Sequence, residues 1–431
     1  AISALGVFIF AACLVALHLS LIRHKVSTRV AGAATVILAG LLPINPAFAQ
    51  LYSLIRLTME PDDKQIIALP SGEIIDPKRL FEFQPLEAPV DRRPKNLVYI
   101  YAEGLDRAFF DKDTFGDVLP HIRETGRTAI EFENILAPPG TTATISGMIA
   151  SQCGVPLAAP LGEHNEVAKY SRFLPRANCL GDELHRLGYD LRFVQGANLE
   201  FAGKGKFYRH HGFDTVLGHY ELADPNEELS DWGRYDINTF STALQHFREA
   251  KANGKPFALF MLTVDTHPPK GYPSPGCEYQ NEKPQLLSTI SCADVMISRF
   301  IRSIMEADTD GGTVIVLGSD HPMMLSELSP SMFPEIRHNT LFIWNSTKDF
   351  SPAISPARPG STFDIGPTVA EAMGLRAGRM GLGTSLFGNN ATLAEQAGSS
   401  ADLDAVVLAL MPFARELWHD MHPAIASISR S

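Results

Sequence analysis

The sequence has no excess of positive charge. Its 431 residues include 48 acidic side chains against 37 Lys and Arg, which gives a net charge of −11 and a pI near 5.7. Proteins that bind nucleic acid or dock electrostatically on anionic lipid normally present a basic surface. The charge balance therefore argues against a nucleic-acid partner, and any contact with a membrane must come from apolar residues.

Cysteine is scarce, with five residues in the chain. Cys13 lies in an apolar N-terminal stretch, and no two of the others form a close Cys-x-x-Cys pair, which disfavours a zinc site built from cysteines. In an exported domain, four cysteines can form two disulfides in three possible pairings. We favour the pairing with short loops, Cys153 with Cys179 and Cys277 with Cys292.

Internal repeats and low-complexity blocks are also missing. The composition of 45% hydrophobic and 20% charged residues is ordinary for a globular enzyme with a short membrane part. The length allows one large α/β domain or two smaller ones.

Two apolar stretches at the N-terminus, residues 1–22 and 30–44, flank a basic hinge at 23–29. The first is long enough to span a bilayer, and the hinge should stay in the cytoplasm. We therefore predict a membrane anchor of two transmembrane helices over residues 1–50, with the rest of the chain on the far side. A cleaved leader ending at the Ala-Phe-Ala of 47–49 is the rival interpretation. Because residue 1 is not Met, a fragment lacking upstream helices also stays open.

Beyond the anchor, residues 51–94 are polar and contain several prolines, so we predict a linker. Strands then alternate with helices over a catalytic domain at 95–392, which predicts an α/β fold with a doubly wound, mostly parallel sheet. A C-terminal amphipathic helix and tail follow at 393–431, with the helix kinked at Pro412. Expected strands are 96–102, 190–195, 257–264, 313–318 and 341–344, and expected helices are 144–151, 236–253, 292–307, 367–373 and 402–419.

Candidate metal ligands stand at the ends of two predicted strands. Asp320 and His321 follow the apolar run 313–318, and Glu103 follows the strand 96–102. Open α/β sheets bind ligands at the carboxyl ends of their strands, and carboxylate with imidazole is a typical donor set for a divalent cation. A capping Asp and a solvated His would explain one strand end alone. Two such ends favour a metal site.

A loop with Pro-Pro-Gly at 138–140 leads into a predicted helix that begins near Thr141. The free N–H groups and the dipole of a helix N-terminus attract phosphate. A threonine there is more often a simple N-cap, but near a metal its hydroxyl can attack phosphorus. Thr142 and Thr144 are close enough to compete for this role.

Two more strand ends supply candidates for substrate contact. His267 comes just beyond the strand 257–264, and Asn198 and Lys204 follow the strand 190–195. Singly, such a His is usually structural and such a Lys is usually solvated. If they converge on a metal-bound threonine, they become a general acid and a phosphate clamp, with Asn198 as a further substrate-binding candidate.

Six stretches resemble the family of phosphoglycerol transferase I and lipoteichoic acid synthase, in the alkaline phosphatase and sulfatase superfamily. The resemblance extends over about residues 95–387 and implies the sheet of that superfamily. The stretches are NLVYIYAE at 96–103, SQCGVPL at 151–157, FVQGANL at 193–199, HGFD at 211–214, TVDTH at 263–267 and SDH at 319–321.

The resemblance also implies a role for each candidate residue. The Gly-Thr junction of the family favours Thr141 as the nucleophile over its two neighbours. Carboxylate, hydroxyl and imidazole ligands suit Mn²⁺ or Zn²⁺, with Mg²⁺ possible. The implied ligands of one divalent ion are Glu103, Thr141, Asp320 and His321, and the implied contacts to the phosphoglycerol group are His267 and Lys204.

The function that the resemblance implies is phosphoglycerol transfer at the bacterial inner membrane, with the catalytic domain facing the periplasm. Glycerophosphate would pass from phosphatidylglycerol to a phospho-threonine and then to hydroxyls of a periplasmic glucan, with release of diacylglycerol. The oligomeric state stays open.

Four other functions were considered. A phosphoethanolamine transferase or a phosphodiesterase would use a similar site, and a membrane-tethered binding protein could keep the fold without activity. A sulfatase would need Arg at the end of the stretch 153–157, where this chain has Leu157, so that interpretation is disfavoured.

Overall fold

The computed structural model describes residues 67–70, 72, 74–90, 93–159, 164–277, 284–332, 337–347 and 355–419. The predicted anchor at 1–50 lies outside these residues, as does the possible cleavage site at 47–49. Within the described part, no helix combines the length and the apolar character needed to cross a bilayer.

An eight-stranded sheet forms the centre of the fold. From β10 to β6 all neighbouring strands run parallel, whereas β11 runs antiparallel to both β10 and β4. The predicted α/β sheet is therefore present, and β11 makes it mixed. In spatial order the strands are β12 (Gly360–Ser361), β4 (Ile130–Leu136), β11 (His338–Trp344), β10 (Thr313–Ser319), β3 (Asn96–Ala102), β9 (Phe257–Leu262), β5 (Asp190–Gln195) and β6 (Thr215–Leu217).

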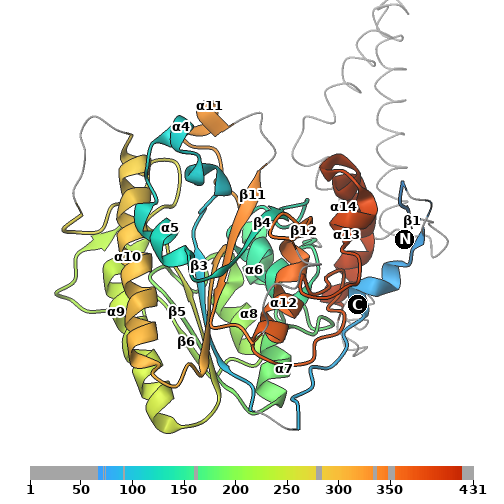
Figure 1. Cartoon of the computed structure of the whole chain (residues 1–431), viewed down its shortest axis with the longest axis horizontal. Helices are drawn as coiled ribbons and strands as arrows, with labels where there is room; N and C mark the ends of the chain where they lie inside the picture. The colour runs from blue at the N-terminus through green and yellow to red at the C-terminus, as the bar shows by residue number, and fades with distance from the viewer. Residues whose placement is uncertain are drawn as a thin grey trace, which may run out of the picture. The chain divides into compact units, whose positions relative to one another are not determined.

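Helices cover both faces of this sheet, as Figure 1 shows. The central strands are apolar on both faces for this reason: in β3, Tyr99 and Tyr101 pack with one helical layer and Val98 and Ile100 with the other. One layer contains α5 (Pro120–Gly126), α9 (Asp236–Asn253) and α10 (Gln285–Ala307), and the other contains α6 (Thr144–Cys153), α7 (Leu180–Arg186), α8 (Lys204–His210) and α12 (Ile365–Ala372).

Shorter elements complete the described part. The two other sheets are the pairs β1 (Ile67–Ala68) with β2 (Ile74–Ile75) and β7 (Leu229–Ser230) with β8 (Gly233–Arg234). The remaining helices are η2 (Pro77–Phe81), η3 (Arg107–Phe110), α4 (Lys112–Phe115), η4 (His164–Lys169), η5 (Phe201–Gly203), α11 (Ser329–Met332), η6 (Thr362–Asp364), α13 (Leu393–Ala397), α14 (Ser400–Ala414) and η7 (Arg415–Trp418).

Several predicted boundaries agree with the structure and others do not. The bounds of β3, β5 and α9 are those predicted. Helix α10 begins at Gln285 rather than at 292, and β11 begins at His338 rather than at 341. Strand β4 was not predicted, although its first residues alternate apolar with acidic side chains, a pattern typical of a half-buried strand.

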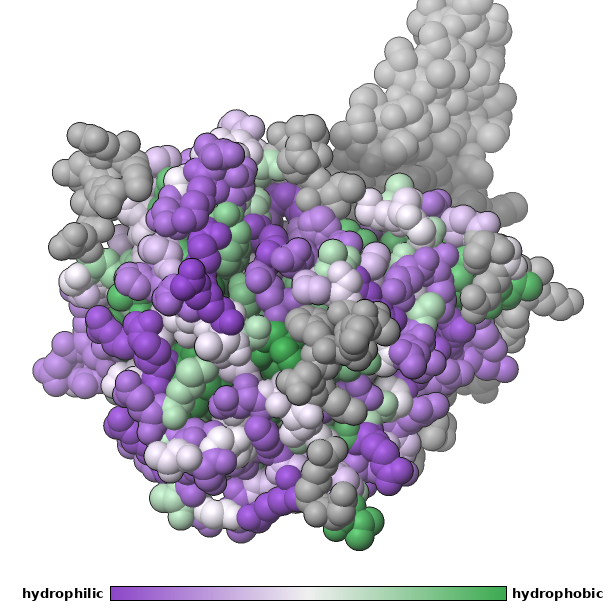
Figure 2. Space-filling model, viewed as in Figure 1, coloured by the Kyte–Doolittle hydropathy of each residue, from purple (hydrophilic) through white to green (hydrophobic). Residues whose placement is uncertain are grey.

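Both ends of the described chain pack into the core of the domain. In the segment predicted as a linker, Ile75 and Leu80 are buried in the same cluster as Leu403 and Leu410 of α14, and α14 contacts both β1 and η2. Figure 1 shows α14 beside α13, on the side of the sheet away from α9 and α10. On the face shown in Figure 2, hydrophilic residues cover most of the described surface.

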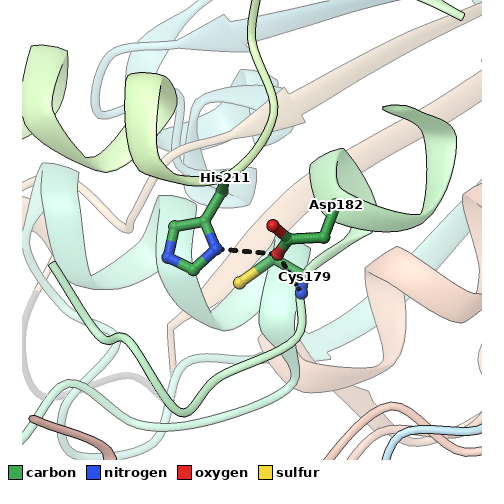
Figure 3. A group of neighbouring side chains, drawn as sticks. All are labelled: Cys179, Asp182 and His211. Carbon is green, nitrogen blue, oxygen red and sulfur yellow. Dashed lines mark hydrogen bonds and ion pairs between the residues drawn. The ribbon is translucent and has the colours of Figure 1, made fainter. Parts of the chain in front are cut away.

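Both disulfides of the favoured pairing are present, Cys153 with Cys179 and Cys277 with Cys292. Beside the first, Asp182 accepts from the backbone N–H of Cys179 at 2.8 Å and lies 2.7 Å from Nδ1 of His211, as Figure 3 shows. Cysteine, aspartate and histidine are typical metal ligands. Because the sulfur of Cys179 is bonded to Cys153, this group acts instead as a polar clamp that holds the disulfide.

Candidate active site

The topology brings the ends of β3 and β10 together. The two strands are parallel neighbours, and Ser319 lies opposite Ala102 in their register. The next residues along each strand, Glu103 and Asp320, therefore emerge side by side at the carboxyl edge of the sheet. Oδ1 of Asp320 accepts from the backbone N–H of Gly104 at 2.9 Å, which fixes this carboxylate against β3.

Glu103, Asp320 and His321 form one buried cluster. Nε2 of His321 lies 3.3 Å from Oε1 of Glu103 and 3.4 Å from Oδ2 of Asp320, and none of the three side chains is more than 2% exposed. Nδ1 of His321 is 2.7 Å from the carbonyl oxygen of Pro322. Because a carbonyl only accepts, Nδ1 carries a proton, and the lone pair of a neutral ring belongs to Nε2, which faces the carboxylates.

The charges in this cluster depend on one another. For His321, burial opposes the charged form, but the carboxylates of Asp320 and Glu103 outweigh it and raise the pKa to about 10. For Glu103, burial is likewise outweighed by His321, and the pKa falls to about 2. Burial and the neighbouring Glu103 raise the pKa of Asp320 to about 7. The site thus holds more negative charge than one imidazolium neutralises.

Two oxygens of the cluster lack hydrogen-bond partners. Oε1 of Glu103 and Oδ2 of Asp320 are buried without a partner among the described residues, which is costly for a polar atom. These are the oxygens that face Nε2 of His321, and the three ligand atoms lie within 4.8 Å of one another. Two carboxylate oxygens and one imidazole nitrogen converging on one point fit a divalent cation.

The structure places Thr144, rather than Thr141, beside this cluster. Oγ1 of Thr144, the first residue of α6, lies 3.4 Å from Oε2 of Glu103 and 3.4 Å from Nε2 of His321. The hydroxyl of Thr141 instead donates to the carbonyl of Pro138 at 2.8 Å, within a turn that precedes the helix. Helix α6 thus begins at Thr144, where the predicted helical range 144–151 begins, and not near Thr141. The role of Thr141 as ligand and nucleophile stays a prediction that these contacts do not support.

A glycine allows α6 to approach the strand end so closely. A Cβ atom on Gly147 would lie 1.7 Å from the backbone oxygen of Asp320, a distance that no side chain tolerates. Any other residue would push α6, and with it the hydroxyl of Thr144, away from the cluster. Sequence reasoning missed this role, although a glycine in the middle of a predicted helix was the available signal.

Lys204 is buried next to the cluster. It begins α8 with 3% of its surface exposed, and its ammonium lies 4.9 Å from the ring centroid of Phe201. Burial lowers the pKa of Lys204 to about 8, and the charges of Glu103 and Asp320 partly oppose that shift. A buried ammonium at this place is suited to hold a phosphate.

His267 lies against an aromatic side chain that the sequence did not single out. The ring of Trp232 lies 3.9 Å from that of His267 and 5.4 Å from that of Phe201, centroid to centroid. Together with the contact of Lys204 on Phe201, these rings form a continuous row from Lys204 to His267. Nδ1 of His267 is 2.8 Å from the carbonyl oxygen of Pro268, so Nε2 of the neutral ring carries the lone pair.

A pair of buried carboxyl groups holds the loop that carries His267. Asp236, at the start of α9, accepts from the backbone N–H groups of Val264 and Asp265 at 2.8 Å and 3.0 Å. Burial raises the pKa of Asp265 to about 7, and burial together with Asp265 raises that of Asp236. Asn198 has a local contact, since its side chain accepts from the N–H of Glu200 at 2.9 Å. Its role in substrate binding stays a prediction.

The chain is similar in sequence to a protein of known name. Phosphoglycerol transferase I of Salmonella typhi is 36% identical over 400 residues, covering 90% of this chain and 49% of the relative. The chain thus spans about half the length of that relative.

Two solved structures show the fold. One is a protein of the alkaline phosphatase superfamily from Vibrio parahaemolyticus, with a TM-score of 0.57 at 19% identity over 79% of this chain and 78% of that one. The other is the lipoteichoic acid synthase LtaP from Listeria monocytogenes, with a TM-score of 0.55 at 15% identity over 72% and 80%. The predicted sheet of alkaline phosphatase type is therefore confirmed.

The sulfatase family model matches residues 95–375, which include all three residues of the buried cluster. The cysteine that a sulfatase motif would use as a nucleophile, Cys153, is bonded to Cys179 here, so family membership does not rest on that motif. Because the match extends over well over half of the residues, this chain belongs to the sulfatase family.

Proposed function

We propose that this protein is a metal-dependent phosphotransferase that moves the phosphoglycerol group of phosphatidylglycerol to an alcohol. The observation that carries the proposal is the hydroxyl of Thr144, which lies at a helix N-terminus and 3.4 Å from two members of the buried cluster. The name of the Salmonella relative, phosphoglycerol transferase I, supports the choice of head group.

Glu103, Asp320 and His321 would hold the cation, with the hydroxyl of Thr144 beside it. Their oxygen and nitrogen donors suit Mn²⁺ or Zn²⁺, and Mg²⁺ is possible. A divalent cation bound there makes a hydroxyl more acidic and offsets negative charge on phosphoryl oxygens.

In the first half-reaction, Oγ1 of Thr144 forms a bond to phosphorus while the bond from phosphorus to the diacylglycerol oxygen breaks. The threonine proton leaves its oxygen, and the diacylglycerol oxygen takes up a proton as it departs. The product is a glycerophosphoryl-threonine. The ammonium of Lys204 offsets charge on the phosphoryl oxygens, and splitting the transfer into two displacements lowers each barrier.

In the second half-reaction, an acceptor hydroxyl attacks phosphorus and the bond to Thr144 breaks. The acceptor loses its proton and the threonine oxygen regains one. His267 is suited to accept the proton of the attacking hydroxyl and to give it to the departing oxygen, because Nε2 of its neutral ring carries a free lone pair. Contact with the glycerol hydroxyls is the alternative role for the same side chain.

We place this chemistry on the periplasmic side of a bacterial inner membrane, with a periplasmic glucan as the acceptor. Support for an oxidising compartment comes from the two disulfides. An apolar anchor in residues 1–50 would keep the site beside the leaflet that contains the lipid donor.

The test is incubation of the metal-loaded protein with vesicles of phosphatidylglycerol or phosphatidylethanolamine, with and without glucan. We expect diacylglycerol release from phosphatidylglycerol only, and a tryptic peptide around α6 that gains one glycerophosphate by mass spectrometry. A peptide that gains phosphoethanolamine instead would show that phosphatidylethanolamine is the donor and that the protein is a phosphoethanolamine transferase. Release that needs water alone would indicate a phosphodiesterase, and bound metal without release would indicate a binding protein.

A pH dependence follows from Lys204. Burial lowers the pKa of Lys204 to about 8, so the ammonium is charged below that pH and neutral above it. If the charge holds the phosphate, kcat/KM should decrease as the pH rises through about 8. In Lys204→Arg the guanidinium stays charged throughout, so this decrease should disappear even if the overall rate is lower. An identical alkaline limb in both proteins would exclude Lys204 as its cause.

A further inference from the structure

A cavity of about 830 Å³ opens beside the candidate active site. Most of its lining is apolar. The named parts of this lining are the end of β4 with Leu136, the loop after β9 with Pro268, the loop after β10 with Met324 and Leu325, and the start of α14 with Leu403. Its volume lies within the range of pockets that enclose small organic ligands. A phosphoglycerol head group is polar and would not need such walls.

The cavity lies next to the reacting groups. His267 lines it, and so does Thr142, two residues before the candidate nucleophile Thr144. The apolar wall 322–325 follows His321 directly in the chain. A molecule whose phosphorus lies at Thr144 can therefore extend its remaining part into this cavity.

Specific contacts hold one wall in place. Arg337 donates to the carbonyl of Met323 at 2.6 Å and also pairs with Asp106, just beyond the end of β3. Met323 in turn packs on Gly104, where an added Cβ would lie 2.9 Å from its terminal methyl carbon. The wall is thus tied to the strand that carries Glu103.

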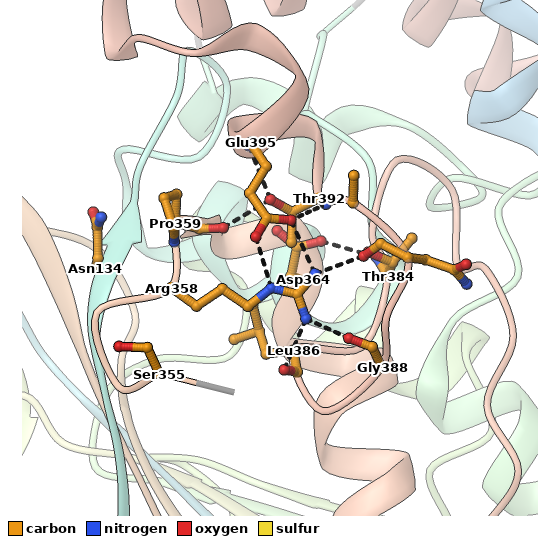
Figure 4. A network of polar contacts seen from close by, with 12 residues as sticks. Asn134, Ser355, Arg358, Pro359, Asp364, Thr384, Leu386, Gly388, Thr392 and Glu395 are labelled. Atoms are coloured by element: carbon orange, nitrogen blue, oxygen red, sulfur yellow. Dashed lines mark hydrogen bonds and ion pairs between the residues drawn. The ribbon is translucent and has the colours of Figure 1, made fainter. Parts of the chain in front are cut away.

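The opposite wall is anchored in a similar way. Arg358 pairs with Glu395 of α13 at 2.9 Å and donates to the carbonyls of Leu386 and Asn390 at 3.0 Å and 2.6 Å. Figure 4 shows this network around Arg358. Because α13 leads directly into α14, the network fixes the helix that contributes Leu403. Both walls are therefore formed before any ligand arrives.

We propose that this cavity binds the diacylglycerol part of the lipid donor, meaning its glycerol backbone and the first methylenes of its acyl chains. The inference rests on the proposed function and adds where the leaving group lies. An apolar leaving group matches the walls of Leu, Met and Pro that supply most of the lining, whereas a sugar acceptor would set most of its hydroxyls against these apolar walls. Leu325, at 77% exposure, marks a rim from which longer chains reach the bilayer.

The test compares soluble donors that differ only in their leaving group. Dibutanoyl, dihexanoyl and dioctanoyl phosphatidylglycerol are set against glycerophosphoryl p-nitrophenol, which has no acyl chain. Because each methylene that enters the cavity favours binding about fourfold, kcat/KM of the wild type should rise steeply with chain length and then level off. A flat dependence on chain length overturns the inference.

Variants locate the effect. In Met324→Asp and Leu325→Asp, the ratio of kcat/KM for the dioctanoyl donor to that for the nitrophenyl donor should fall at least tenfold. Leu408→Asp is the matched control, since Leu408 is an exposed leucine of α14, at 56% exposure, that does not line the cavity, and its ratio should equal that of the wild type. An unchanged ratio in both cavity variants, or an equal fall in the control, overturns the inference.

A binding measurement separates this inference from the proposed function. Dioctanoylglycerol titrated into wild type and Leu325→Asp by calorimetry needs no turnover. Binding that is weakened by Leu325→Asp, without cleavage of any donor, would refute the proposed function and keep the lipid cavity. Cleavage of the donors without dependence on acyl-chain length would keep the proposed function and refute the lipid cavity.

Discussion

Replacing Thr144 with alanine should abolish diacylglycerol release, with a loss on the order of 10⁶-fold, as when a covalent enzyme loses its nucleophile. The hydroxyl of Thr144 lies 3.4 Å from Glu103 and His321, and alanine removes that oxygen while keeping the helix. The tryptic peptide around α6 should no longer gain a glycerophosphate. Metal content should stay close to that of the wild type, because the three charged ligands remain.

Thr141→Ala is the matched control, since it makes the same change three residues earlier. In the wild type the hydroxyl of Thr141 donates to the carbonyl of Pro138. Thr141→Ala should therefore lose about 1 kcal/mol of stability, and its α6 peptide should still gain a glycerophosphate. If Thr141→Ala loses the label and Thr144→Ala keeps it, the assignment from the Gly-Thr junction is right and the one from geometry is wrong.

Glu103→Gln should remove metal and activity together. The change keeps the shape of the side chain but removes the negative charge of Glu103, which is one of two buried carboxylates in the cluster. Oε1 of Glu103 has no hydrogen-bond partner among the described residues, so a cation is its expected partner. Loss of even an outer partner weakens metal binding by about 10- to 100-fold, so loss of a direct ligand should weaken it more. We expect a lower metal content by mass spectrometry and no diacylglycerol release.

Thermal unfolding gives a second readout that does not depend on turnover. A ligand that binds only the folded state raises its stability, so added Mn²⁺ or Zn²⁺ should raise the Tm of the wild type much more than that of Glu103→Gln. Asp182→Asn is the control. Asp182 belongs to the group of Cys179, Asp182 and His211, which is not expected to bind a metal because the sulfur of Cys179 is in a disulfide. An equal rise in Tm for the wild type and Glu103→Gln would show that the metal does not bind at this cluster.

The arrangement of the strands explains why so much of the site was predictable. A run that is apolar on both faces predicts a buried parallel strand, and the residues just after such strands gather at one edge of the sheet. Glu103, Asp320 and His321 come directly after β3 and β10, so their convergence was expected once both strands were recognised. Strand β4 carries a different signal, since alternation of apolar and polar residues is typical of a half-buried strand, and this signal was missed.

The sequence by itself determined the α/β sheet and the three charged residues that meet at its edge, because each depends on residue type and on position relative to a strand. The sequence allowed three disulfide pairings, and the structure contains the favoured one. Only the tertiary structure decided between Thr141 and Thr144. The two residues are three positions apart and have the same side chain, but Thr141 lies in the turn before α6 and donates to Pro138, whereas Thr144 begins α6 and its hydroxyl faces the cluster. The row from Lys204 to His267 and the cavity against α14 likewise depend on contacts between segments far apart in the chain, which no local pattern encodes.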